Sequence, residues 1–192
     1  MENAITVPHL SAAQLAAGLA EVRRSPRAAG TLDLVVRRPA MDARELLVEG
    51  RLDPDAGLVG DTWGQRGSSR TADGSAHPDM QLNVINSRFA ALVAGPDRDA
   101  WALAGDQLYV DLDVSVEALP EWTRIALGDV AVIQVTDQPH TGCVKFAARF
   151  GRDAHALVWS DEGKALRLRG LNARVVVPGP VRPGDAVRVL PS

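Results

Sequence analysis

Cys143 is the residue of this chain best suited to nucleophilic or soft-metal chemistry, and it is the only cysteine among 192 residues. It follows the turn-like run Pro139-His140-Thr141-Gly142 and precedes an amphipathic stretch that carries Lys145 and Arg149. Amide groups in a first helical turn carry partial positive charge, and with two nearby cations they favour a thiolate. A thiolate attacks electrophiles, carries sulfur and ligates soft metals. We therefore treat Cys143 as the candidate catalytic and metal-ligating residue; the alternative is an inert, buried cysteine.

His140 is the second candidate catalytic residue because it lies three residues before the thiol. It is suited to accept the thiol proton or to hydrogen-bond a ligand, and it could equally face solvent beside the turn. A Cys–His hydrolase would also need an oxyanion hole and a third, orienting group. The sequence identifies neither of these.

Residues 60–79 contain almost no aliphatic side chains, so they are expected to form a long loop. Arg66 and Arg70 lie in its glycine- and serine-rich first half, Gly60–Arg70. Such a loop can cradle an oxyanion, although the Gly-Lys-Ser/Thr ending of a P-loop is absent. We take both arginines as candidate cofactor-binding residues; the alternative is a flexible surface loop.

The formal charge of −3 hides an uneven distribution. Residues 1–142 carry 12 basic and 20 acidic side chains, whereas residues 143–192 carry 9 basic and 4 acidic ones. The basic residues of 143–192 could form a cationic wall that binds a small anionic cofactor or substrate. The alternative interpretation is that they lie on solvated strand faces. Nucleic acid is not expected as a partner, because the basic residues are few and are not interleaved with aromatic ones.

The compartment expected from the sequence is the cytoplasm. No apolar run approaches the roughly 20 residues of a membrane span, so no membrane partner is expected. The first residues lack the basic and apolar regions of a secretion signal. A single cysteine agrees with a reducing environment.

The hydrophobic pattern predicts a mainly β protein, a closed or partly closed β-barrel with short peripheral helices. A first helix is expected over residues 10–24 with Ser11 as its N-cap, which makes residues 1–30 a helical appendage to a barrel domain of residues 31–192. Further helices are expected at 87–94, after Cys143 and over 153–167. Alternating or apolar runs predict strands at 31–38, 43–49, 80–86, 108–114, 123–127, 130–135, 173–177 and 186–190.

Three ordered elements give the chain a resemblance to a known family. They are Gly105-Asp106-Gln107-Leu108, the strand pair Thr123 to Val135, and the cysteine element P-H-T-G-C-x-K-F. In this order they resemble the MOSC family, the C-terminal domain of molybdenum cofactor sulfurases. The resemblance covers roughly residues 31 to 190 and is strongest from Gly105 to Phe150.

The resemblance implies a β-barrel that handles sulfur and molybdenum, with Cys143 in the place of the family's signature thiol. It implies molybdopterin as the cofactor, and it adds residues of the matching elements to the candidate cofactor-binding set, namely Asp106, Gln107, Thr141, Gly142 and Lys145. Some family members are standalone reductases of N-hydroxylated compounds that hold the cofactor themselves. Others are fused to cysteine desulfurases that use pyridoxal phosphate.

One departure separates the chain from many standalone members. Their His-Gly-Gly element is replaced here by T-W-G-Q-R-G-S-S-R after Gly60-Asp61. A sulfur carrier that accepts persulfide sulfur on Cys143 from a separate cysteine desulfurase therefore stays open, as does a noncatalytic anion-binding barrel. Pyridoxal phosphate, or an electron donor, would belong to a partner protein.

Overall fold

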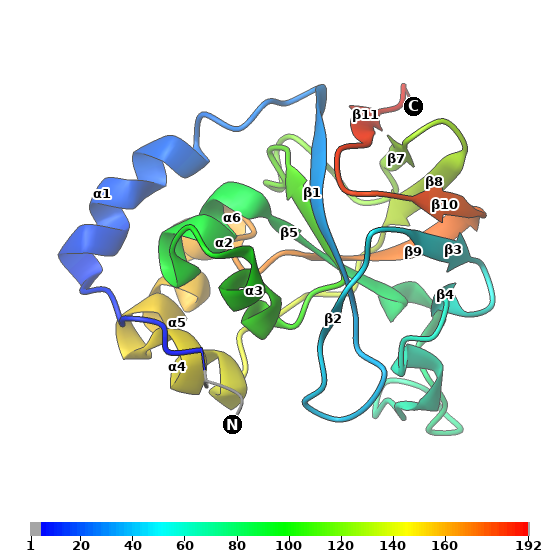
Figure 1. Cartoon of the computed structure of the whole chain (residues 1–192), viewed down its shortest axis with the longest axis horizontal. Coiled ribbons are helices and arrows are strands. Elements are labelled where there is room, and N and C mark those ends of the chain that lie inside the picture. Colours follow the sequence, from blue (N-terminus) through cyan, green and yellow to red (C-terminus); the bar gives the residue numbers. More distant parts are fainter. Residues whose placement is uncertain (1–4, 192) are drawn as a thin grey trace.

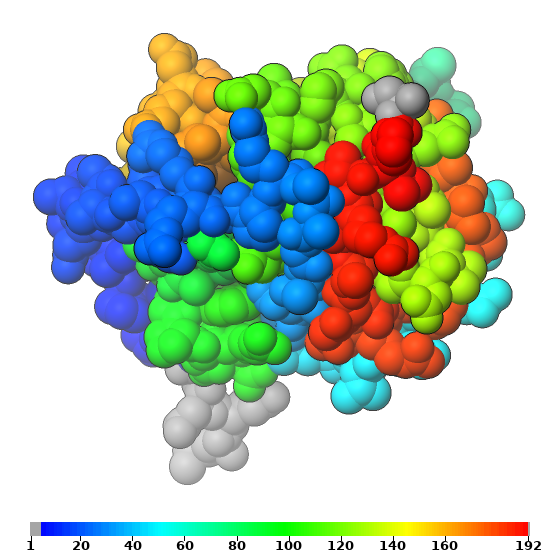
Figure 2. Space-filling model, turned by 90° about the horizontal axis from the view of Figure 1, so that it is seen from above, coloured from blue at the N-terminus to red at the C-terminus, as the bar shows by residue number. Residues whose placement is uncertain are grey.

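The computed structural model describes residues 5–191, whose main sheet closes into a barrel of seven strands (Figure 1). Round the barrel they are β1 (Ala29–Arg37), β6 (Leu108–Asp111), β5 (Leu82–Asn86), β9 (Leu171–Val177), β8 (Ala131–Val135), β7 (Arg124–Leu127) and β11 (Ala186–Val189). The last strand pairs back onto the first, with Ala29 opposite Arg188, as the adjacent blue and red segments in Figure 2 show. The pair β5–β6 is parallel and the other barrel pairs are antiparallel. The expected β-barrel is confirmed.

The barrel walls separate two hydrophobic clusters. One fills the interior, and the other lies between the outer wall and the helices. In β1 the register shifts between Leu32 and Leu34, so Leu32 joins the interior cluster whereas Leu34 and Val36 join the helix side. A bulge of this kind reverses the alternation of a strand. A strand with unbroken alternation would put Leu32, Leu34 and Val36 on one face, and the bulge moves Leu32 to the other.

Short helices gather on one side of the barrel in Figure 1. They are α1 (Ala12–Val22), α2 (Ser87–Ala94), α3 (Arg98–Trp101), α4 (Val144–Phe150), α5 (Arg152–Trp159) and α6 (Asp161–Ala165). Ser11 caps α1 in a capping box with Gln14, as expected. The buried stripe of α1, Leu15, Leu19 and Val22, belongs to the same cluster as the buried residues of α2 and α5. The first helix therefore shares its core with the helices that follow.

The expected helix over residues 153–167 is instead two helices, α5 and α6. Ser160 between them has an extended backbone, and its hydroxyl accepts a hydrogen bond from the amide of Gly163 at 3.0 Å. Serine competes in this way with a continuing helix and starts a new one. The chain then passes through Arg167, whose φ is +45°, and enters β9.

A second, three-stranded sheet was not expected. It joins β3 (Gly50–Asp53), β4 (Gly57–Leu58) and β10 (Gly179–Val181). The first two strands lie in a passage that reads as turns, because strands of two to four residues show no clear alternation. The expected strand over residues 43–49 is reduced to β2 (Glu45–Leu46), which pairs with the end of β1.

The loop expected over residues 60–79 is present. It is irregular apart from the single-turn helices η1 (Trp63–Gln65) and η2 (Pro78–Met80), and a third, η3 (Ala102–Ala104), precedes β6. None of the helices in residues 5–191 has the length and apolarity that a bilayer crossing requires.

Candidate functional site: a cationic cavity beside Cys143

A cavity of about 700 Å³ opens where the loop after β1, the loop before η2, the start of β5, the turn before β6 and the start of α4 meet. We call it the cationic cavity. Its volume falls within the roughly 300–1,000 Å³ of small-molecule and cofactor sites. Its lining is Arg38, Met41, Asp42, Arg44, Thr62, Gln65, Arg66, Arg70, Met80, Asn83, Ala104, Gly105, Pro139, His140, Thr141, Cys143, Lys145, Arg149 and Arg169.

Seven lysine and arginine side chains line this cavity, and part of their charge is neutralised by carboxylates. Asp61 binds Arg38 at 2.8 Å, and Asp106 binds Arg169 at 2.7 Å. Asp42 binds Lys145 at 2.7 Å and Arg149 at 3.3 Å. The remaining cations, Arg44, Arg66 and Arg70, have no carboxylate partner within residues 5–191. The cavity therefore carries excess positive charge and is suited to an anion.

The pKa values of two of these unpaired arginines, Arg44 and Arg66, are lowered by burial and by neighbouring positive charges. Burial lowers the pKa of Arg44, and repulsion from Arg149 and Arg38 lowers it further. Burial likewise lowers the pKa of Arg66, with repulsion from Arg38 added. Each shift means that the folded chain holds these charges at a cost that a bound anion would relieve.

Three residues that line the same cavity carry a buried polar atom without a hydrogen-bond partner. In the described part of the chain these atoms are Nε of Arg44, Oγ1 of Thr62 and Nε of Arg169. Buried polar groups are nearly always paired, and leaving one unpaired costs roughly 1–3 kcal/mol. These side chains lie around one cavity, so a ligand with hydrogen-bond acceptors that enters it could satisfy them once they turn toward it.

Two lining residues, His140 and Arg169, form an ion cluster with the buried Asp106 behind them. The Asp106 carboxylate is fully buried; its Oδ2 accepts from Arg169 Nη1 at 2.7 Å, and its Oδ1 lies 2.9 Å from His140 Nε2. Burial would raise the pKa of Asp106, but Arg169 and His140 outweigh it and hold that pKa below its usual value. Two backbone turns set this geometry: Gly105 has φ +89°, and Gly170 approaches β5 so closely that a Cβ there would lie 2.4 Å from the Val84 carbonyl.

His140 is held as a neutral imidazole by these neighbours. Burial lowers its pKa, Arg169 lowers it further, and the bond to Asp106 opposes this only in part. Because an ionised Asp106 can only accept, the proton sits on Nε2. The Nδ1 atom is then left as the acceptor of the ring. His140 is therefore a fixed group able to take up or pass on a proton.

Cys143 is the N-cap residue of α4, and its side chain is exposed. Its thiol makes no capping hydrogen bond. The preceding residue, Gly142, is buried, and its carbonyl accepts a hydrogen bond from Trp159 Nε1 at 3.1 Å, which anchors the chain just before the thiol. The thiol thus lies free at the rim of the cationic cavity.

The structure brings most of the predicted site residues together. Cys143, His140, Thr141, Lys145, Arg66 and Arg70 all line the cationic cavity, and Asp106 supports His140 from behind. The other two do not line it. Gln107 is fully buried and binds the backbone of Asn83 and Gln81, and Gly142 lines a neighbouring cavity.

Several residues of the cavity were missed by sequence reasoning, above all Arg38, Arg44 and Arg169. Arg38 follows β1 directly and precedes Pro39, a position that ends a strand at the barrel rim. Arg169 lies in the basic stretch 143–192, for which a cationic wall and solvated strand faces were both open; it is buried, with its guanidinium 5.4 Å from the Phe146 ring centre. Arg38 pairs with Asp61 and Arg169 pairs with Asp106 through contacts across the fold, which spacing along the chain does not reveal.

No group of three or more His, Cys, Asp or Glu side chains within residues 5–191 is placed to hold a metal ion. The cavity offers one thiol, one imidazole and a surrounding set of cations. Such a donor set suits a metal that arrives within an anionic organic chelate better than a bare cation.

Comparison with known proteins identifies the fold. No family profile and no curated protein matches the sequence. Among solved structures, the YuaD protein from Bacillus subtilis has a TM-score of 0.62 at 17% identity, with 84% of this chain and 95% of that chain covered. YiiM from Escherichia coli has a TM-score of 0.53 at 19% identity, covering 84% of this chain and 70% of that one. A structure titled as a hypothetical protein has a TM-score of 0.57 at 20% identity, covering 85% and 68%. At these identities, none above 20%, the likenesses show the fold alone, and the predicted β-barrel with short helices is confirmed.

Proposed function

We propose that the cationic cavity binds a molybdenum–pterin cofactor, molybdopterin, with the Cys143 sulfur as the protein's ligand to the metal. The observation that carries this proposal is that Arg44, Thr62 and Arg169, each with a buried polar atom that has no partner within residues 5–191, line one cavity with a thiol at its rim. A cofactor with phosphate and pterin oxygens would supply the missing acceptors. The MOSC-like fold adds support by analogy.

The roles of the chain's own residues follow from their positions. Arg44, Arg66 and Arg70 carry the charge that no carboxylate balances, so they would hold the anionic part of the cofactor. Bound molybdenum would supply two-electron chemistry beside the cavity. His140, neutral and fixed by Asp106, would hold or pass on a proton at Nδ1.

The reaction class that we propose is the reduction of an N-hydroxylated compound. It consumes two electrons and two protons, converts N–OH to N–H and releases water. The electrons would come from a separate redox partner protein and a proton from the solvent through His140. A panel of N-hydroxylated amines and amidines, assayed with the loaded protein and a chemically reduced dye, tests this step. The absence of any turnover would leave cofactor binding as the function.

Cofactor binding is tested by expressing the protein in bacteria that synthesise the cofactor and are supplied with molybdate. We expect close to one molybdenum per chain by elemental analysis, with pterin detected by fluorescence after oxidation. Cys143→Ser should lose most of the molybdenum, whereas Lys164→Gln, a change outside the cationic cavity, should not. Wild-type protein free of both molybdenum and pterin would contradict the proposal.

A second candidate function is sulfur transfer, which the exposed and unbonded thiol of Cys143 favours. In this function the thiol accepts persulfide sulfur from a partner cysteine desulfurase that carries pyridoxal phosphate. Mass spectrometry after incubation with a desulfurase and cysteine should show the gain of one sulfur atom on Cys143. If Cys143 gains no sulfur while it still reacts with an alkylating probe, this function is excluded.

A further inference from the structure

A second cavity of about 330 Å³ lies on the other side of the Pro139–Gly142 segment. Pro139, His140, Thr141 and Arg169 line both cavities, so this segment forms a shared wall. The remaining lining residues come from three regions that are distant in sequence: Val116 and Glu121; Thr136, Asp137, Gln138 and Gly142; and Val158, Trp159, Gly163, Lys164, Arg167, Gly170 and Leu171. We call it the Trp159 cavity. It lies apart from the cationic cavity, and its lining includes the carboxylates Glu121 and Asp137.

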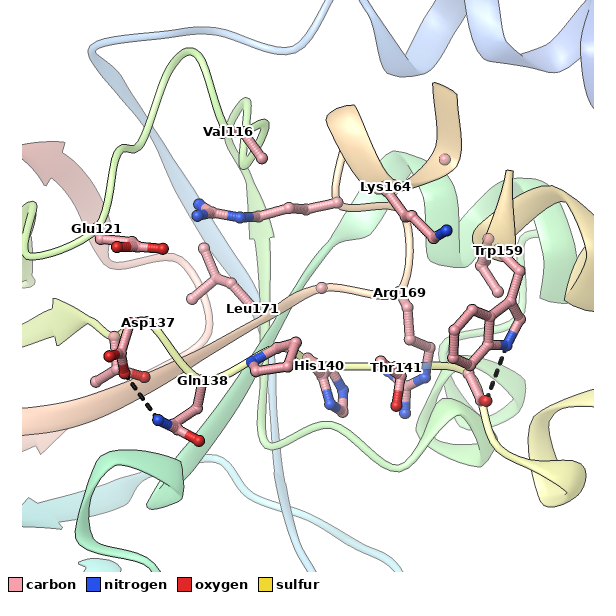
Figure 3. A pocket seen from close by; sticks show the side chains of 17 residues that line it. Val116, Glu121, Asp137, Gln138, His140, Thr141, Trp159, Lys164, Arg169 and Leu171 are labelled. Atoms are coloured by element: carbon pink, nitrogen blue, oxygen red, sulfur yellow. Dashed lines mark hydrogen bonds between the residues drawn. The ribbon is translucent and has the colours of Figure 1, made fainter. Parts of the chain in front are cut away.

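Apolar side chains form much of this lining. Val158 and Leu171 are buried, and the Trp159 ring stands at one end in Figure 3. The ring is held there because its Nε1 donates to the Gly142 carbonyl at 3.1 Å. An aromatic wall with aliphatic neighbours is suited to a flat apolar group, and the volume accommodates one or two rings.

Two carboxylates, Glu121 and Asp137, and three cations, Lys164, Arg167 and Arg169, line this cavity. Glu121 and Asp137 lie at the end away from Trp159, where Asp137 is hydrogen-bonded by Gln138, whereas Lys164 lies beside Trp159 (Figure 3). The Lys164 ammonium is 5.7 Å from the Trp159 ring centre and makes no salt bridge within residues 5–191. A cation beside an aromatic wall, with no carboxylate of its own, is a ready partner for a ligand carboxylate.

Arg167 adds a strained feature to the same lining. It is a non-glycine residue with φ +45°, and its Nη1 donates to the Leu119 carbonyl at 2.5 Å. Burial lowers its pKa, and the charge of Glu121 opposes this. Residues in such backbone conformations persist where the surroundings enforce them, often at ligand sites.

From these features we infer that the Trp159 cavity is a second small-molecule site, for a planar aromatic carboxylate. The ring system would lie against Trp159, Val158 and Leu171, with its carboxylate on the Lys164 ammonium. The inference does not rest on the proposed cofactor binding in the cationic cavity. A ligand bound here would contact His140 and Thr141 from behind, which gives it a route to influence that cavity.

Calorimetric titration with 2-naphthoate tests the inference, with the uncharged 2-naphthalenemethanol as its matched analogue. We expect saturable one-to-one binding of the carboxylate, and about fivefold weaker binding of the alcohol, as for the loss of one partly exposed ion pair. Lys164→Gln should weaken carboxylate binding by a similar factor. Lys145→Gln, the same change in the cationic cavity, should leave it unchanged.

A second variant tests the location without removing a charge. Val116 is 50% exposed, so Val116→Trp should fold and fill the mouth of the cavity, abolishing 2-naphthoate binding. Absence of saturable binding to the wild type would overturn the inference. Weakening by Lys145→Gln but not by Lys164→Gln would also overturn it, because the probe would then occupy the cationic cavity. Unchanged molybdenum content in Lys164→Gln keeps this result separate from the cofactor test.

Discussion

The Asp42 carboxylate lies 2.7 Å from the Lys145 ammonium and joins the loop after β1 to α4 across the mouth of the cationic cavity. Asp42 has φ +59°, an unusual conformation for a residue other than glycine, and it also contacts Arg149. Its hydrogen bond from Lys145, and the charges of Lys145 and Arg149, lower its pKa. Asp42 thus places a negative charge where an incoming anion would bind, and it competes with that anion.

Replacing Asp42 by Asn should therefore strengthen anion binding. We expect the affinity for inorganic pyrophosphate, measured by calorimetry at low ionic strength, to rise roughly two- to fivefold, as for the removal of one exposed charge interaction. Asp55→Asn, an exposed change of the same type away from the cavity, serves as the control. Weaker pyrophosphate binding in Asp42→Asn would show that Asp42 shapes the site rather than competing for it.

The buried Asp106 should be the most sensitive carboxylate for stability. Asp106→Asn leaves Arg169 buried beside a neutral partner, and breaking a buried pair in this way costs about 3–5 kcal/mol. Urea denaturation should show this loss in the free energy of unfolding. Asp111→Asn, which affects a partly exposed pair with Arg88, should cost no more than about 1 kcal/mol. Equal losses in both variants would contradict the account of the buried cluster.

His140 should make stability depend on pH in mildly acidic solution. Its folded pKa lies below the ordinary value of 6.5, so as the pH falls below 6.5 the unfolded chain takes up a proton before the folded chain does. The contribution of His140 is therefore complete above this value and is lost as the pH falls. His140→Gln should flatten the decline in unfolding free energy between pH 7.5 and 5. If the decline is unchanged in His140→Gln, titratable groups other than His140 cause the loss of stability at low pH.

The exposed thiol of Cys143 should react with iodoacetamide in the folded protein. We expect complete modification under native conditions by mass spectrometry, and slower modification when pyrophosphate occupies the neighbouring cavity. Because there is no other cysteine, Cys143→Ser provides an unlabelled control. Modification that occurs only after denaturation would remove the thiol from the proposed site.

Much of the barrel is predictable from local patterns, because short alternating runs and turn residues mark its strands. The helix start at Cys143 and the N-cap at Ser11 are also local features. The small sheet was missed because β3 and β10 are far apart in sequence and each is only three or four residues long. The bulge in β1 and the break at Ser160 depend on tertiary packing that overrides the periodic pattern.

The candidate site divides along similar lines. Cys143, His140 and Lys145 lie within six residues of one another, so the sequence shows them as a group. Arg38, Arg44 and Arg169 join them only through the closure of the barrel and the placing of two loops. An arginine becomes recognisable as a ligand-binding residue when its carboxylate partner, or the lack of one, is known. That information is absent from a single sequence.

The central claim is that the unpaired donors of the cationic cavity bind the pterin cofactor. Anaerobic titration of the cofactor-free protein with molybdenum cofactor released from a donor protein, followed by pterin absorbance, tests it most directly. We predict saturation at one cofactor per chain, about tenfold weaker binding in Arg44→Gln because a charge-assisted hydrogen bond is lost, and unchanged binding in Lys164→Gln. No saturation, or equal affinity in all three proteins, would contradict the account.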